Sequence, residues 1–196
     1  MNYNNLNKDK LIEMLVHQDY RLRKLELENK RLNYLASIDP MTEVLNRNAG
    51  LELLDKEVKL ANLSSKPIVI SFIDVDKLKS VNDTFGHNEG DNLLIKVAQI
   101  LKQGIRKNDY VIRMGGDEFL VIFPETSLEQ ANKAWERVLK LINQQNTRNE
   151  KYELSISYGF YEHSKYNKKI SISKMIEKAD MEMYKVKCKK TFKGVY

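Results

Sequence analysis

The segment PIVISFIDVD, residues 67–76, limits the possible folds of this chain more than any other stretch. It is almost continuously apolar and rich in β-branched residues, a pattern typical of a strand that is buried on both faces of a sheet. The apolar run ends in two acids, Asp74 and Asp76. We therefore expect a buried central strand that presents carboxylates at one edge of the sheet.

Helix and strand patterns alternate along the rest of the chain. Amphipathic spacing predicts helices over residues 47–63, 91–103, 127–145 and 171–187. Either Ser171 or Ser173 is suitable as the N-cap of the last helix. Strands are predicted at residues 109–114, 118–123 and 152–161, and the first two should form a hairpin; residues 76–90 are polar and turn-rich at both ends. This order predicts an α+β fold, in which helices pack against a sheet of about four core strands.

Residues 8–37 contain neither Gly nor Pro and are predicted to form one helix. Apolar and amide residues recur at alternating steps of four and three, and we call this set the heptad seam: Leu11, Leu15, Gln18, Leu22, Leu25, Asn29, Leu32 and Ala36. Asn29 falls on an a position, where a polar residue can set the register of a parallel dimer. Residues 1–36 are therefore predicted to be a parallel coiled-coil stalk; the alternative is an amphipathic helix that folds back on the domain.

The composition limits where in the cell the protein can be expected and which partners its charge favours. The single cysteine, Cys188, cannot form an internal disulfide, and no apolar leader or membrane-length run is present, so we expect a cytoplasmic protein without a membrane span. The formal net charge of +6 is uneven, because residues 165–193 hold ten lysines against three acids. Such a basic end is typical of a surface that binds nucleic acid, a membrane or nucleotide phosphates. It is equally typical of a lysine-rich face that is only solvated.

The heptapeptide RMGGDEF, residues 113–119, places two glycines and two acids at the tip of the predicted hairpin. Gly115 and Gly116 allow the backbone to adopt positive φ and to approach a ligand closely. If the hairpin pairs beside residues 67–76, Asp74 and Asp117 meet. Carboxylates that cluster without His or Cys favour Mg²⁺ or Mn²⁺ over zinc, and such ions usually serve phosphate chemistry. The alternative is an ordinary hairpin turn with solvated acids.

Four segments resemble the motifs of the GGDEF family, the diguanylate cyclases. They are DPMTEVLNR (39–47), FIDVDKLKSVNDTFGHNEGD (72–91), RMGGDEF (113–119) and ADMEMYKVK (179–187), and their order and spacing match across residues 37 to 190. The resemblance implies that residues 37–196 are a GGDEF domain with a palm-like fold, a mostly antiparallel sheet flanked by helices. It also implies that two GTP molecules are joined into cyclic di-GMP with release of two pyrophosphates.

The resemblance assigns the metal and catalytic residues. Asp74 matches a residue that binds metal through its side chain, and Val75 matches one that binds through its backbone carbonyl. Asp117 matches a metal ligand that is also the proposed general base, and Glu118 matches a second acid beside the metals. The family uses Mg²⁺ or Mn²⁺, and two ions are expected in each active site.

The resemblance also assigns the nucleotide contacts. Asn82 and Asp91 match the residues that select guanine, and the Asp91 carboxylate can accept hydrogen bonds from guanine N1–H and the 2-amino group. Lys79 and Lys187 match lysines that contact the phosphates. Gly115 and Gly116 leave room for the phosphates and offer amide donors.

A product-binding site is implied by the run RKND, from Arg106 to Asp109. It fits the family's R-x-x-D pattern, and Arg137 falls where relatives contribute a second arginine.

The same comparison reveals a departure near the C-terminus: Lys190 stands where the family has Gly, and Thr191 stands where it has an Arg that contacts phosphate. Lysine does not reproduce the bidentate fork of arginine, so GTP affinity is affected more than the chemistry.

Each GGDEF domain binds one GTP, so the resemblance implies a homodimer in which two domains face each other. The stalk formed by residues 1–36 would keep the two domains at high effective concentration. The first alternative is a module that binds GTP or cyclic di-GMP without turnover. The second is a coiled-coil scaffold whose basic end binds nucleic acid, which leaves the acids unexplained; on the preferred interpretation nucleic acid is not a partner.

Overall fold

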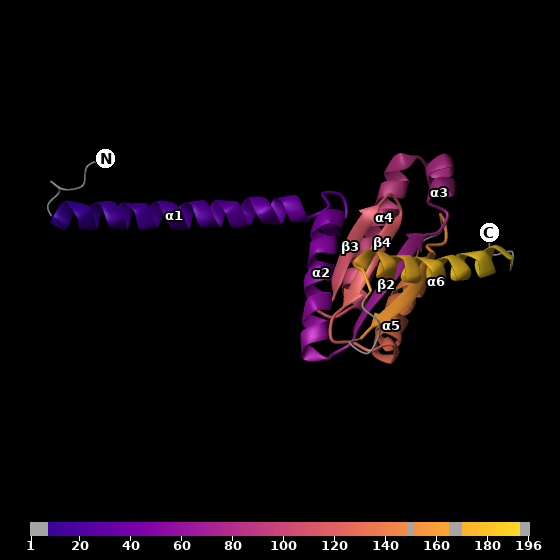
Figure 1. Cartoon of the computed structure of the whole chain (residues 1–196). Coiled ribbons are helices and arrows are strands. Elements are labelled where there is room, and N and C mark those ends of the chain that lie inside the picture. Colours follow the sequence, from indigo (N-terminus) through magenta and orange to yellow (C-terminus); the bar gives the residue numbers. More distant parts are fainter. Residues whose placement is uncertain (1–7, 149–150, 165–169, 193–196) are drawn as a thin grey trace. The chain divides into compact units, whose positions relative to one another are not determined.

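A computed structural model describes residues 8–148, 151–164 and 170–192 of the chain (Figure 1). The side chains of Lys30, Arg31, residues 33–35, Thr191 and Phe192 lie outside this description. The chain divides into two compact units, of which the first ends at Ser37 and the second begins at Ile38.

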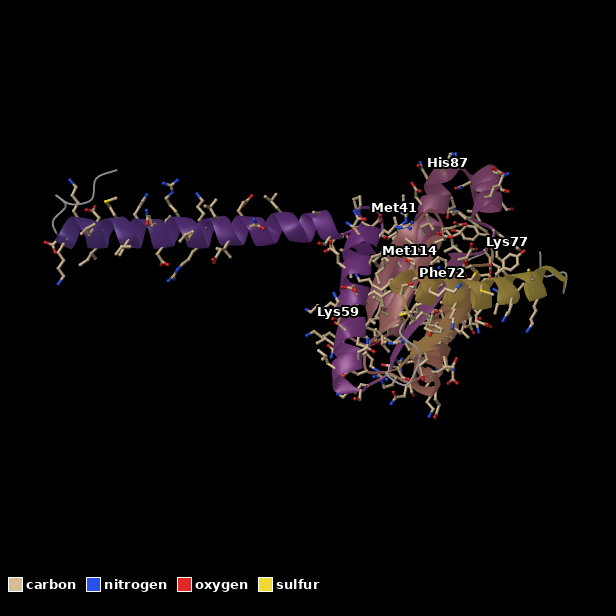
Figure 2. All side chains as sticks on the ribbon, viewed as in Figure 1. Met41, Lys59, Phe72, Lys77, His87 and Met114 are labelled. Carbon is tan, nitrogen blue, oxygen red and sulfur yellow. The ribbon has the colours of Figure 1, made fainter. Side chains whose placement is uncertain are left out.

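The first unit is the single helix α1, Lys8–Ser37, as the sequence predicts. Side chains project from it on all sides (Figure 2). Four leucines of the heptad seam are more than half exposed, namely Leu15, Leu22, Leu25 and Leu32. Apolar groups that remain in water contribute no burial energy, so these leucines would add stability only if another surface covered them.

The second unit contains a five-stranded sheet in the order β1-β3-β4-β2-β5. β2, Ile68–Val75, lies between β4, Glu118–Phe123, and β5, Ile156–His163, and is antiparallel to both. β3, Tyr110–Gly115, pairs antiparallel with β4 and parallel with β1, Leu45–Asn46. All eight residues of β2 are buried, which confirms the predicted central strand. The two-residue β1 was not predicted, because so short a strand shows no alternation.

Helices cover both faces of the sheet (Figure 1). α2, Arg47–Ser64, and α6, Ile172–Phe192, pack on the face that holds Ile68, Ile70 and Phe72. α4, His87–Gly104, and α5, Leu128–Asn146, pack on the opposite face with Val69 and Ile73. Successive residues of β2 therefore alternate between two cores, which explains its unbroken apolar sequence.

The segment 76–90 contains a helix that the sequence pattern did not reveal. α3, Leu78–Phe85, buries Val81 and is separated from α4 by Gly86, whose φ of 87° ends one helix before the next begins. α4 consequently begins at His87 rather than at residue 91 as predicted. At α6 the amide of Lys174 donates to Ser171 Oγ over 3.3 Å, so Ser171, one of the two predicted candidates, caps the helix.

Gly159 allows α6 to lie directly on β5. A Cβ atom at Gly159 would stand 2.1 Å from the amide nitrogen of Met183 and 2.3 Å from the carbonyl oxygen of Ala179. Both atoms belong to the helix backbone, so a larger residue has to displace α6 itself. This close approach sets where the C-terminal part of α6 meets the end of β2.

We predict that Gly159→Ala destabilises the domain because α6 must move away from β5. Overpacking of this kind costs about 1–3 kcal/mol of unfolding free energy, which corresponds to a fall of about 2–12 °C in Tm for a chain of this size. Thermal unfolding followed by circular dichroism measures it. Glu182→Ala, an exposed change in the same helix, should shift Tm little; equal Tm values for Gly159→Ala and the wild type would contradict the prediction.

Candidate active site

The acids predicted to form the site meet where β2 ends and β4 begins. Asp74 lies opposite Glu118 in the antiparallel pairing of these strands. The amide of Val75 donates a 3.0 Å hydrogen bond to the carbonyl oxygen of Asp117. The hairpin thus pairs beside the central strand as predicted. It places Asp74, Asp117 and Glu118 at one edge of the sheet, which we call the acidic edge.

The hairpin turn depends on the backbone freedom of its two glycines. Gly115 and Gly116 have φ angles of 144° and 52°, in the range that disfavours residues with a side chain. A Cβ atom at either position would meet no other described atom within 4 Å. The turn therefore needs glycine at these positions because of the backbone angles, and not because a side chain would clash. The open surroundings of the turn leave room for a ligand.

Arg113 holds this turn against the segment DPMTEVLNR. Its guanidinium donates to the carbonyl oxygen of Gly116 over 3.0 Å and forms an ion pair with Asp39 at 3.2 Å. The side chains of Arg113 and Asp39 are only 13% and 19% exposed, so the pair is shielded from water. Burial favours a higher pKa for Asp39, but hydrogen bonds from Thr42 and the charge of Arg113 outweigh it, and the pKa is lowered. Sequence reasoning did not identify this support, although both residues lie in quoted motifs.

The acids at the edge of the sheet disfavour one another's charge. The pKa of Asp74 is raised, chiefly by burial and further by the charges of Asp117 and Asp76, against the opposing effect of Lys187. The pKa of Glu118 is raised by burial first, and then by Asp117, Asp180 and Asp74. A cation at this edge would relieve both the desolvation and the repulsion.

The donors present suit a magnesium-type ion. Carboxylates from β2 and the hairpin, with the backbone carbonyl of Val75, form a set of hard oxygen donors. Within the described residues no three His, Cys, Asp or Glu side chains converge as a ready-made metal cage. Mg²⁺ ordinarily keeps several waters and uses one or two carboxylates together with substrate phosphates, so an open set of this kind fits it.

Two lysines of α6 reach the acids at the end of β2. Lys187 Nζ lies 2.7 Å from Asp74 Oδ1. The structure therefore brings Lys187, a residue predicted to contact phosphate, to the acidic edge. Lys190 Nζ lies 2.7 Å from Asp76 Oδ2. Asp76 stands at the end of β2 with Asp74, as expected, and both side chains are largely buried, at 3% and 11% exposed. Asp76 also accepts hydrogen bonds from the hydroxyls of Ser155 and Ser157.

The guanine-selecting candidates lie on two adjacent helices. Asn82 on α3 and Asp91 on α4 are both partly buried. A Cβ atom at Gly90 would stand 1.9 Å from Asn82 Oδ1, so the glycine makes room for the amide beside α4. Gly90 is a supporting residue that sequence reasoning missed, although the glycine was visible in the quoted motif. Lys79 is exposed on α3.

The R-x-x-D group lies at the opposite end of β3 from the glycine turn. Six residues of strand span about 17 Å, so this group is separate from the acidic edge. The amide of Arg106 donates to Asp109 Oδ2 over 2.8 Å, and the amide of Asp109 donates back to the Arg106 carbonyl over 3.0 Å. Burial raises the pKa of Asp109, against the charges of Arg106 and Arg137. The Arg106 side chain remains exposed and lines a hollow of about 520 Å³.

Arg137 approaches this group from α5. Its Nε donates to the carbonyl oxygen of Gly104 over 3.0 Å, which ties α5 to the end of α4. The charge of Arg137 acts on Asp109 and opposes the effect of burial on its pKa. The structure therefore brings all three predicted product-binding residues to one region of the domain.

Comparison with known proteins identifies the family. The profile described as "Diguanylate cyclase, GGDEF domain" matches residues 36–193. The chain therefore belongs to the GGDEF family. It is 35% identical over 158 residues to diguanylate cyclase DosC of Escherichia coli K12, an alignment that covers 78% of this chain and 34% of the relative. The chain spans about a third of the length of that curated relative.

Solved structures confirm the predicted α+β, palm-like fold. Diguanylate cyclase SiaD of Pseudomonas aeruginosa, solved with its activator SiaC, is similar with a TM-score of 0.77 and 28% identity, covering 92% of this chain and 69% of that one. The GGDEF domain of DgcB from Caulobacter crescentus, solved with c-di-GMP, has a TM-score of 0.70 and 27% identity, covering 78% and 90%. None of the described helices is both long and apolar enough to cross a membrane.

Proposed function

We propose that this chain is an active diguanylate cyclase, which condenses two GTP molecules into cyclic di-GMP and releases two pyrophosphates. The observation that carries the proposal is the meeting of Asp74, Asp117 and Glu118 beside the two-glycine turn. Membership of the GGDEF family and the name of the relative DosC support it. A catalytically inactive module that binds GTP or cyclic di-GMP is the alternative outcome of the tests below.

In this proposal the acidic edge prepares the 3′-hydroxyl of one GTP to attack the α-phosphate of the other. Asp74, Glu118, Asp117 and the carbonyl oxygen of Val75 would hold two Mg²⁺ or Mn²⁺ ions. Such ions lower the pKa of a bound hydroxyl and neutralise charge that develops on phosphate. Asp117, which directly follows the two glycines of the turn, would accept the proton of the hydroxyl.

Other residues of the chain bind and orient the nucleotide. A Cβ atom at Gly115 or Gly116 would meet no described atom within 4 Å, and this open turn leaves room for phosphates, to which the backbone amides would donate. Lys187, now beside Asp74, and Lys79 on α3 supply positive charge to the triphosphate. Asn82 and Asp91 select guanine, since adenine lacks the paired N1–H and 2-amino donors and would leave the Asp91 carboxylate unpaired.

The first experiment is the chromatography of nucleotides after purified protein is incubated with GTP and Mg²⁺. We expect cyclic di-GMP from the wild type and a loss of at least about 100-fold in rate for Asp117→Ala, because both the proton acceptor and a metal ligand are removed. Glu129→Gln, an exposed change on α5, is the matched control and should retain activity. Wild-type protein that binds GTP without forming product would favour the inactive module.

We further propose that cyclic di-GMP inhibits the enzyme through Arg106, Asp109 and Arg137. The Arg106 side chain is exposed beside a hollow, while its backbone is fixed by two hydrogen bonds with Asp109. Guanidinium groups suit both phosphate and guanine, which the product combines. The DgcB domain was solved with c-di-GMP, which supports product binding by this family.

Arg106→Ala is expected to remove product inhibition while turnover at low product concentration stays near the wild-type value, because the residue lies a strand's length from the acidic edge. Initial rates against added cyclic di-GMP measure the effect, and we expect the inhibition constant to rise at least about tenfold. Lys107→Ala removes a neighbouring charge at a position that the R-x-x-D pattern leaves unspecified, and this variant should remain inhibited. Unchanged inhibition of Arg106→Ala would contradict the proposal.

We also propose that α1 holds two copies of the chain together as a parallel coiled coil. Each domain would then supply one GTP to the shared reaction, and tethering would give the second domain a high effective concentration. The exposed leucines of the heptad seam support this role, because coiled-coil pairing would bury them.

Replacing both Leu22 and Leu25 by serine should weaken the dimer and make specific activity fall steeply on dilution. Sedimentation velocity and rate measurements over the same concentration range test this. Leu27→Ser is the matched control, because Leu27 is 68% exposed on α1 but lies off the heptad seam. A variant with both seam leucines replaced that remains dimeric and fully active at low concentration would show that α1 does not have this role.

A further inference from the structure

The C-terminal part of α6 is attached to the end of β2 by two ion pairs. Lys187 and Lys190 are three residues apart, so they lie on one side of the helix. Their partners, Asp74 and Asp76, are two residues apart at the end of β2. Each pair has an Nζ–Oδ distance of 2.7 Å. The pairs are alike in length but differ in their surroundings.

Lys190 is held in a closed network. Its ammonium contacts Asp76 Oδ2, the Ser155 hydroxyl at 3.0 Å and the carbonyl oxygen of Ile156 at 2.7 Å, which accounts for all three of its donors. Asp76 also accepts from Ser155 and Ser157 over 2.6 and 2.7 Å. Since its side chain is only 3% exposed, Asp76 needs this cation to remain charged and buried.

The Lys187 pair is somewhat more exposed than the Lys190 pair. The Lys187 side chain is 37% exposed against 29% for Lys190, and Asp74 is 11% exposed against 3% for Asp76. Under the proposed function Asp74 is a metal ligand, so its carboxylate would be shared with a cation when nucleotide binds. The Lys187 ammonium would then turn to the nearby phosphates. This exchange needs the helix backbone at Lys187 to stay in place.

We propose that Lys190 is a positioning residue that anchors α6 on β2 and β5, so that Lys187 can exchange its contact with Asp74 for one with a phosphate of GTP. The inference rests on the proposed function, because that function supplies the phosphate and the cation. Lys190 itself makes no contact with the nucleotide, since its donors are used by Asp76, Ser155 and Ile156. It acts through Lys187.

A double-mutant cycle in nucleotide binding tests this directly. The ligand is a GTP analogue with a methylene group between the α- and β-phosphates, which cannot release pyrophosphate, titrated with Mg²⁺ into the full-length chain by calorimetry. We expect Lys187→Met and Lys190→Met each to weaken binding by about tenfold. The double variant should bind no more weakly than Lys187→Met alone, because Lys190 has no further effect once Lys187 is lost.

Controls separate anchoring from general charge and from misfolding. Lys185→Met removes the same charge from an exposed ion pair on α6 and should change affinity less than about twofold. If Lys190→Met does not fold, Asp76→Asn combined with Lys190→Met removes both charges and leaves no buried carboxylate unpaired. That pair should fold, as judged by its circular dichroism, and should still bind the analogue about tenfold more weakly.

Several results would overturn the inference. The first is an additive loss of affinity in the double-mutant cycle, and the second is an unchanged affinity of Lys190→Met for the analogue. The inference would also fail if Lys185→Met lost as much affinity as Lys190→Met, or if the wild type did not bind the analogue. Binding and turnover separate this inference from the proposed function. A wild type that binds the analogue but forms no cyclic di-GMP would refute the cyclase proposal, while the cycle would still show whether Lys190 acts through Lys187.

Discussion

The antiparallel pairing of β2 with β4 is the constraint on which the rest of the structure depends. β2 is buried on both faces, with Ile70 on one core and Ile73 on the other, so its register cannot slip by one residue without exchanging the two cores. That register sets Asp74 opposite Glu118. The hairpin turn, the acids beside it and the approach of α6 all follow from a pairing that apolar burial enforces.

The site concentrates negative charge at the end of this apolar strand, and the surrounding basic residues offset it in different ways. Asp76 is sealed by Lys190 and two serine hydroxyls, whereas Asp74 is paired with the more exposed Lys187. Asp39 and Arg113 form a third pair, which supports the glycine turn from outside the acidic edge. Of the two pairs at the end of β2, the Asp74 pair is the more exposed, with side chains 37% and 11% exposed against 29% and 3% for the Asp76 pair.

Segments with strong, long patterns were predicted well. The central strand, the hairpin and the main helices each carry an apolar periodicity that burial enforces over many residues. The predictions failed where local structure depends on a few distant contacts. β1 has two residues and exists because β3 pairs with it, and α3 forms in a polar segment because Val81 is buried. Gly90 is important because side chains of another helix, above all Asn82, lie where its own side chain would stand.

By itself the sequence determined the alternation of helices and strands, the spacing of the heptad seam, and the family to which the motifs belong. It did so because periodicity and short motifs are local properties of the chain. Only the tertiary structure decided that Asp74 and Asp76 have different surroundings, that Lys190 is enclosed in a network, and that Arg113 supports the glycine turn. These outcomes depend on which strand edge and which helix turn meet after folding, and residue spacing along the chain does not encode such distances.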